Sequence, residues 1–245
     1  MRITFTGSAE EFYFVTASRI ADMIRQKPDA VIGLATGRTT TGVHRALCQI
    51  HAREKFDTSK VTVFGMDEIT NVSRLFPGSC YDMLLKQVVL PLGIPMENYL
   101  MPPTYSDDFG RECRAFEEAI DKRGGVDLQI LGIGENGHLG FNQPGTPFES
   151  TTWLSRMDEN LDERIRRESG SAPDADLGGF TIGIKNIMMS RSIVLAANGA
   201  AKAEIVHKAL RGRISPELPA SVLQLHPFAE TVLDPEAAAL FEEKK

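Results

Sequence analysis

A glycine-rich loop carries the polar side chains best suited to acid–base chemistry. Residues 132–145 read Gly-Ile-Gly-Glu-Asn-Gly-His-Leu-Gly-Phe-Asn-Gln-Pro-Gly, and the apolar run before them, 126–131, predicts a buried strand. Glycine has no Cβ, so it allows tight turns and close approach to a ligand. Open α/β sheets bind ligands at the carboxyl ends of their strands. The loop is therefore a candidate site, although its histidine can instead simply satisfy a backbone carbonyl. Its polar candidates are His138, Asn136, Asn142 and Gln143.

A second candidate site follows the apolar run 30–35. Residues 36–42, Thr-Gly-Arg-Thr-Thr-Thr-Gly, precede a helix that we expect from Val43 to about Ala52. Backbone N–H groups before a helix bind anions, and Arg38 adds a positive charge. The spacing matches neither G-x-x-x-x-G-K-[ST] nor G-x-G-x-x-G, so nucleotide-binding interpretations lose support. A plain turn between strand and helix remains the alternative, since such turns are often rich in glycine and threonine.

Two adjacent carboxylates, Asp67 and Glu68, end a predicted strand at 61–66. Neighbouring side chains on a strand point in opposite directions, so one can enter a cleft while the other faces solvent or a neighbour. Such a carboxylate can act as a general base if it reaches the proton that it removes. Metal binding is the rival role. No further carboxylate or histidine stands at ligand spacing, so we predict no metal.

Two basic residues, Arg167 and Lys202, could converge on a phosphate, although each could equally be a solvated surface charge. The remaining four histidines are assigned more ordinary positions. We expect three of them on helix surfaces (His44, His51 and His207) and a structural role for His226 at a helix end.

Strands and helices alternate along the chain, which predicts an α/β fold with a mainly parallel sheet. The strands are expected at 30–35, 61–66, 126–131, 181–184, 192–197 and 230–233, and residues 99–101 are expected to be a short apolar piece within an irregular, proline-marked segment. The helices are expected at 8–26, 43–52, 80–89, 109–122, 200–210, 216–223 and from Pro235 onward. No linker or repeat divides the chain, so we predict one domain over residues 1–245. A polar, arginine-rich segment at about 155–179 is predicted to be a mobile lid or binding loop.

The composition and net charge of the chain argue against several classes of function. The net charge of −6 argues against broad binding to nucleic acid or anionic membranes, which require a basic face. No uncharged apolar run reaches the ~20 residues that span a bilayer, and no signal peptide is expected at the N-terminus. Three cysteines without C-x-x-C spacing are typical of reduced, mostly buried thiols. We therefore expect a cytoplasmic protein, and an anionic small molecule remains a possible partner because a local pocket can be positive on an acidic protein.

Together these motifs resemble the glucosamine-6-phosphate deaminase family, also called glucosamine-6-phosphate isomerase. The resemblance runs from Ala30 to Ala237, and several motifs in family order make it specific. They are G-L-A-T-G-R-T-T-T-G at Gly33, M-D-E at Met66, G-I-G-E-N-G-H-L-G-F-N-Q-P-G-T at Gly132, T-I-G-I-K at Thr181 and A-S-V-L-Q-L-H at Ala220. The resemblance implies a Rossmann-like three-layer sandwich, a fold shared with 6-phosphogluconolactonases and ribose-5-phosphate isomerase.

The resemblance also implies a reaction: an aminosugar 6-phosphate becomes a ketose 6-phosphate and ammonia, with no metal or cofactor. Asp67 would align with the base that moves a proton between C1 and C2. His138 would align with the ring-opening acid–base group, with Asn136 and Gln143 as its partners. The phosphate would be held by Thr36, Gly37, Arg38, Thr39, Thr40, Arg167 and Lys202.

Departures from the family pattern leave more than one function open. The family usually has glutamate where this chain has Gln143, which cannot carry a charge or a proton. The P-G-S-C sequence at 77–80 looks more like the galactosamine-6-phosphate branch, so the substrate could be either epimer. A catalytically weak sugar-phosphate-binding paralogue and a 6-phosphogluconolactonase-like hydrolase are the two rival functions. The sequence leaves monomer and homo-oligomer equally open.

Overall fold

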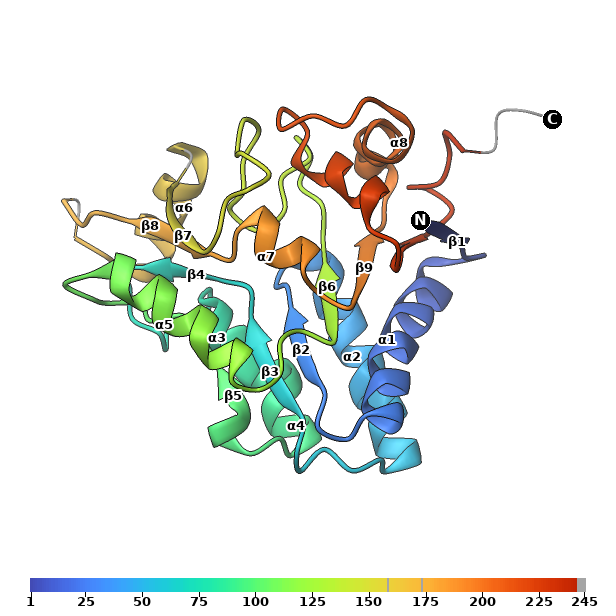
Figure 1. Ribbon diagram of the computed structural model, residues 1–245, viewed down its shortest axis with the longest axis horizontal. Coiled ribbons are helices and arrows are strands. Elements are labelled where there is room, and N and C mark those ends of the chain that lie inside the picture. Colours follow the sequence, from blue (N-terminus) through green and yellow to red (C-terminus); the bar gives the residue numbers. More distant parts are fainter. Residues whose placement is uncertain (158, 173, 242–245) are drawn as a thin grey trace.

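The computed structural model describes residues 1–157, 159–172 and 174–241, and a parallel sheet forms its centre (Figure 1). Within the described residues, every neighbouring pair of strands in this sheet is parallel. The strand order is β1 (Arg2–Phe5), β10 (Ala229–Leu233), β9 (Ser192–Ala197), β6 (Leu128–Leu131), β2 (Val31–Leu34), β3 (Thr62–Gly65) and β5 (Tyr99–Leu100). The predicted α/β class with a mainly parallel sheet is confirmed.

Helices cover both faces of the sheet, which makes three layers. Alternate residues of β9 show this: Ile193 and Leu195 enter one hydrophobic core, while Val194 and Ala196 enter the other. Parallel strands are apolar throughout because both faces are buried in this way. One core is covered by α1 (Ala9–Gln26), α2 (Arg38–Glu54), α3 (Cys80–Leu84), a π-helical turn η1 (Leu85–Val89) and α4 (Leu90–Leu92). The other is covered by α5 (Phe109–Asp121), α7 (Ile184–Met188), α8 (Ala203–Arg211) and η4 (Pro219–Leu225). Like η4, the shorter η2 (Met96–Asn98) and η3 (Ala200–Lys202) are 3₁₀ helices.

A second, antiparallel sheet of three strands branches from the first. Its order is β4 (Asp67–Thr70), β8 (Gly178–Thr181) and β7 (Trp153–Arg156). The chain passes from β3 into β4 through the single residue Met66, whose N–H donates to Leu34 in the main sheet and whose carbonyl accepts from Ile182. Asp67 is paired with Thr181 at the first position of the small sheet. The acidic pair therefore begins a new strand, where the sequence predicted a strand end and a polar connection.

The segment predicted to be a lid contributes to this second sheet. It includes part of β7, α6 (Glu159–Ser169) and the start of β8, while its residues 158 and 173 lie outside the described part. Ile165 and Leu177 are buried with Ile69, Val72 and Phe76 in a third hydrophobic cluster. The segment is thus partly packed core, and its proposed motion stays a prediction.

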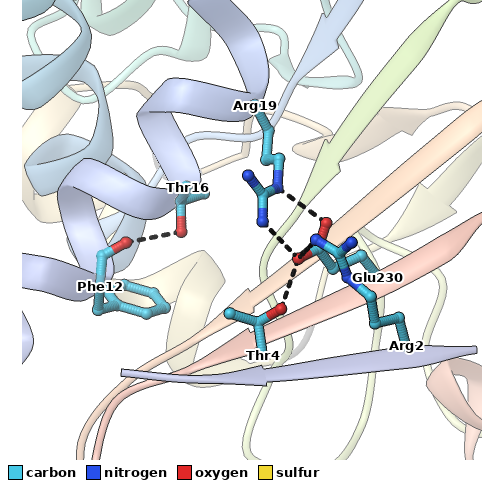
Figure 2. Close-up of polar contacts among 6 residues, drawn as sticks. All are labelled: Arg2, Thr4, Phe12, Thr16, Arg19 and Glu230. Carbon is cyan, nitrogen blue, oxygen red and sulfur yellow. Dashed lines mark hydrogen bonds and ion pairs between the residues drawn. The ribbon is translucent and has the colours of Figure 1, made fainter. Parts of the chain in front are cut away.

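Strand β1 was missed by the sequence prediction, and its attachment is polar. Glu230 of β10 accepts hydrogen bonds from Arg2 (2.7 Å), Thr4 (2.6 Å) and both Nε and Nη2 of Arg19 on α1 (2.9 Å each), as Figure 2 shows. Partial burial alone would raise the pKa of Glu230, but the bonds from Arg19, Thr4 and Arg2 outweigh it and lower the pKa to about 2. One ionised carboxylate thus joins the edge strand to helix α1.

Four expectations need correction. Helix α2 begins at Arg38 rather than Val43, because Gly37 takes the N-cap position at φ +137°. The strand expected at 181–184 ends at Thr181, and α7 begins at Ile184. Residues 235–241 form turns rather than a helix, and the carboxylate of Asp234 accepts from both Ala237 N and Gly199 N. His44 is fully buried rather than on the surface, with Nδ1 2.9 Å from Gln87 Oε1.

Among the described helices, none is both long and apolar enough to cross a bilayer. The three cysteines are unpaired: Cys80 and Cys113 are buried and Cys48 is half-buried, as predicted.

Candidate active site

The glycine-rich loop folds back on itself beyond the carboxyl end of β6 (Figure 1). Gly134 N donates to the carbonyl of His138 at 3.0 Å, and Gly137 N donates to the carbonyl of Gly134 at 3.0 Å. A Cβ at Gly134 would lie 2.3 Å from the imidazole ring of His138. The ring therefore packs directly on the loop backbone, and residue 134 must be glycine for it to do so.

Amide groups support the loop around His138. Asn136 Nδ2 donates to Gln143 Oε1 at 3.0 Å, and Asn136 Oδ1 accepts from the backbone N–H of His138 at 3.2 Å. The structure thus brings three predicted residues together. Gln143 reaches His138 through Asn136, and as an acceptor in this bond it does what a glutamate oxygen would do, without the charge.

Asn142, the fourth polar residue of this loop, has a structural role. It is fully buried, and its Nδ2 donates to the carbonyls of Leu139 (2.8 Å) and Ile182 (2.9 Å). Its Oδ1 accepts from Nε1 of Trp153 at 3.0 Å. All of its side-chain hydrogen-bonding groups are therefore used to fix the loop against β7 and the end of β8.

Asp67 lies against this loop. A Cβ added at Gly140, which has φ +59°, would lie 3.2 Å from Asp67 Oδ2 and 2.8 Å from Thr181 Oγ1. Burial raises the pKa of Asp67 to about 6, and a hydrogen bond from the Cys80 thiol, at 3.4 Å, opposes that rise. A carboxylate with a pKa near neutrality is suited to take up and release a proton.

Glu68, the second carboxylate of the pair, faces a neighbour rather than a cleft. It is fully buried and accepts from the backbone N–H groups of Ile69 (2.9 Å), Cys80 (2.9 Å) and Tyr81 (2.7 Å). Burial raises its pKa to about 7, although these three donors act in the opposite direction. Glu68 therefore fixes the start of α3 beside Asp67. The sequence prediction missed this role of Glu68 and the contact of Cys80 with Asp67. In both cases the partners on β4 and α3 are 12 or 13 residues apart in the sequence.

Five of the predicted phosphate-binding residues, Thr36 to Thr40, lie at the N-terminus of α2. Arg38, Thr39 and Thr40 lie in the first helical turn, where backbone N–H groups lack partners within the helix. Thr39 Oγ1 donates to Asn198 Oδ1 at 2.6 Å, and Thr40 Oγ1 donates back to the Gly37 carbonyl at 3.2 Å. These two hydroxyls are thus engaged within the protein, so the backbone and the basic side chains are the stronger anion donors here.

Lys202 joins this group electrostatically, whereas Arg167 does not. Burial lowers the pKa of Lys202, with Glu135 raising it and Arg38 lowering it further, so the three charges lie near one another. Arg167 is exposed on α6, and no contact between described residues connects it with α2 or Lys202. Figure 1 shows α6 beside the small sheet and α8 on the other side of the glycine-rich loop.

The geometry agrees with comparisons to known proteins. Residues 8–233 match the sequence profile of the family described as glucosamine-6-phosphate isomerases/6-phosphogluconolactonase. The chain belongs to this family. A glucosamine-6-phosphate deaminase of Clostridium botulinum (strain Langeland / NCTC 10281 / Type F) is 40% identical over 239 residues, 98% of each chain. One from Thermoanaerobacter pseudethanolicus is 36% identical over 244 residues, covering 100% of this chain and 96% of that protein. The resemblance seen in the sequence is confirmed.

Solved structures of the family share the fold. A monomeric glucosamine-6-phosphate deaminase superposes with a TM-score of 0.91 at 36% identity, covering 98% of this chain and 100% of that chain. The 6-phosphogluconolactonase from Trypanosoma cruzi has a TM-score of 0.78 at 16% identity, covering 98% and 97%. At that identity the lactonase likeness speaks for the fold alone. The predicted Rossmann-like α/β domain is confirmed by these superpositions.

Proposed function

We propose that the protein converts an aminosugar 6-phosphate into the ketose 6-phosphate and ammonia. The observation that carries this proposal is the position of Asp67: a half-buried carboxylate, with its pKa raised to about 6, against the loop that holds His138. Full-length relatives at 36–40% identity, named glucosamine-6-phosphate deaminases, support it.

His138 and Asp67 are assigned separate steps of the proposed reaction. In the proposed mechanism, His138 moves the proton of the anomeric hydroxyl as the sugar ring opens, since imidazole titrates near neutral pH. Asp67 then removes the C2 proton of the open-chain sugar and returns a proton at C1. This proton transfer leaves an imine at C2, and addition of water to the C=N bond releases ammonia and leaves the C2 carbonyl of the ketose. Asn136 and Gln143 position the loop segment from which His138 extends, through the two hydrogen bonds described above.

The phosphate is proposed to bind at the N-terminus of α2, between Arg38 and Lys202. Helix N–H groups and two nearby cations offer both directed hydrogen bonds and charge to a phosphate dianion. Glu135 lowers the net positive charge there, and it interacts with Lys202 before any ligand arrives. Arg167, which is exposed on α6, remains a proposed phosphate ligand.

A second candidate function, a weakly active sugar-phosphate-binding protein, is favoured by one observation. The bond from Asn136 ends on the uncharged amide of Gln143, which cannot raise the basicity of the site. A lactonase-like hydrolase has less support, because the lactonase likeness is confined to the fold.

Ammonia release from glucosamine 6-phosphate and galactosamine 6-phosphate separates these functions. Release from either sugar with saturation kinetics supports the deaminase and identifies the epimer. Saturable binding by calorimetry without ammonia would overturn it in favour of the binding protein. Hydrolysis of 6-phosphogluconolactone without ammonia would instead assign the lactonase reaction.

A further inference from the structure

The thiol of Cys80 lies between the proposed base and the proposed phosphate site. Its Sγ is 3.4 Å from Oδ1 of Asp67 and 3.1 Å from the hydroxyl oxygen of Thr36. An ionised carboxylate can only accept hydrogen bonds, and a thiol has one proton to donate. The direction of both bonds follows for ionised Asp67: the S–H group donates to Asp67, and the Thr36 hydroxyl donates to sulfur.

The backbone of Cys80 is held as firmly as its side chain. Its N–H group donates to Glu68, as does that of Tyr81, and Ser79 caps the next N–H group of α3. Consecutive residues of β4 therefore hold one residue of α3, Asp67 through the thiol and Glu68 through the backbone. This double attachment keeps Sγ at a fixed position relative to the Asp67 carboxylate.

We infer that Cys80 is a positioning residue for Asp67, and that it links this carboxylate to the phosphate site through Thr36. The thiol holds Oδ1, which leaves Oδ2 on the side of Gly140 and the loop that carries His138. A bound phosphate that attracts the Thr36 proton removes a donor from sulfur, so ligand binding and the proton affinity of Asp67 are coupled. The inference rests on the proposed function for the base role of Asp67, but the contact itself does not.

The surroundings of Asp67 predict the sign of the effect. Its described neighbours come from β4 (Glu68), α3 (Cys80), β8 (Thr181) and the loop (Gly140), and the titratable ones are Glu68 and Cys80. Burial raises the pKa of Asp67 and the thiol donor lowers it. Removing the donor without admitting water should therefore raise this pKa further.

The test replaces Cys80 with valine, which fills a similar volume but donates no hydrogen bond. The Asp67 carboxyl is titrated by NMR in protein labelled with ¹³C at aspartate side chains, and its signal is assigned by its absence in Asp67→Asn. We expect Cys80→Val to move the midpoint upward by about half a pH unit or more, and Cys80→Ser, which keeps a donor, to return most of that shift. Cys113→Val is the matched control, since Cys113 is equally buried, at 6%, but lies on α5, where the charged groups acting on its thiol are Glu117, Arg114 and Glu112 rather than Asp67; it should not move the midpoint.

The outcomes are distinct. An unchanged or lowered midpoint in Cys80→Val overturns the inference, and so does a serine variant that titrates like the valine variant. If Cys80→Val does not fold, Thr36→Val leaves the thiol in place and should give a smaller upward shift; no shift there also overturns the inference. In the ammonia assay, the acid limb of kcat/KM should move with the NMR midpoint. An NMR shift in a protein that releases no ammonia would reject the proposed function but establish the thiol–carboxylate contact.

Discussion

Replacing Gly134 with alanine tests whether the imidazole of His138 must lie on the loop backbone. The new methyl group would lie 2.3 Å from the ring, whereas ordinary contacts begin at 3.4 Å, so the ring must move by about 1 Å. Displacement of a catalytic group by about 1 Å costs on the order of 100-fold in rate, or about 2.7 kcal/mol of transition-state stabilisation. We therefore expect kcat for the ring form of the aminosugar phosphate to fall about 100-fold in Gly134→Ala.

Ammonia release measures this loss, and Gly132→Ala is its control in the same loop. A Cβ at Gly132 meets no atom within 4 Å, and its backbone is outside the left-handed region, so this variant should keep nearly full activity. Thermal unfolding shows whether both variants remain folded. Wild-type turnover in a folded Gly134→Ala protein would refute the reasoning, because ring opening would then not depend on the position of His138. Equal losses in both variants would refute it as well, since they would reflect general disturbance of the loop.

Three further predictions concern single residues. Asp67→Asn should abolish exchange of the C2 proton with D₂O, followed by NMR, while leaving ligand affinity nearly intact; persistent exchange would remove Asp67 from the base role. Gln143→Glu should raise kcat roughly 10-fold if a missing charge limits ring opening, and an unchanged or lower kcat would show a site adapted to glutamine. Glu230→Gln should lower the unfolding temperature, because three partners lose their ionised acceptor. The pKa of Glu230 is lowered from 4.5 to about 2, so its stabilisation is present above pH 4.5 and is lost as the pH falls toward 2. Glu10→Gln, an exposed position on α1, should leave that pH dependence unchanged.

The inner strands of the parallel sheet could be predicted because they are short apolar runs that are visible locally, whereas its two end strands, β1 and β5, were missed. The small sheet could not be predicted in this way. Asp67 pairs with Thr181, more than a hundred residues away, and β7 and β8 are no more apolar than the loops around them. Tertiary pairing decides such strands. For the same reason the sequence placed Asp67 at the end of a strand, whereas it starts the next one.

In the candidate site, too, some interactions join residues that are near in sequence and others join separate elements. The family resemblance implied Asn136 and Gln143 as partners of His138, and in the structure these two residues, seven apart in the sequence, are bonded to each other. The contact of Asp67 with Cys80 and the electrostatic interactions of Lys202 with Arg38 and Glu135 depend on how separate elements pack. His44 was misplaced for the same reason: its neighbour Gln87 is on another helix, and a helical pattern alone does not show which of its faces is covered.

Asp67 and His138, the residues proposed for the two chemical steps, are held in place by different parts of the fold. Asp67 belongs to the junction of two sheets, where Glu68 and Cys80 attach it to α3. His138 belongs to a loop held by glycines, by Asn142 and by one bond between Asn136 and Gln143. A change at residue 143 therefore alters support for ring opening and leaves the geometry of proton transfer at C2 intact. It follows that Gln143 can reduce turnover of the cyclic sugar without reducing exchange of the C2 proton in a sugar that is already open. Measuring both rates on one protein preparation distinguishes a slowed deaminase from a protein that only binds sugar phosphates, because only the former retains the exchange.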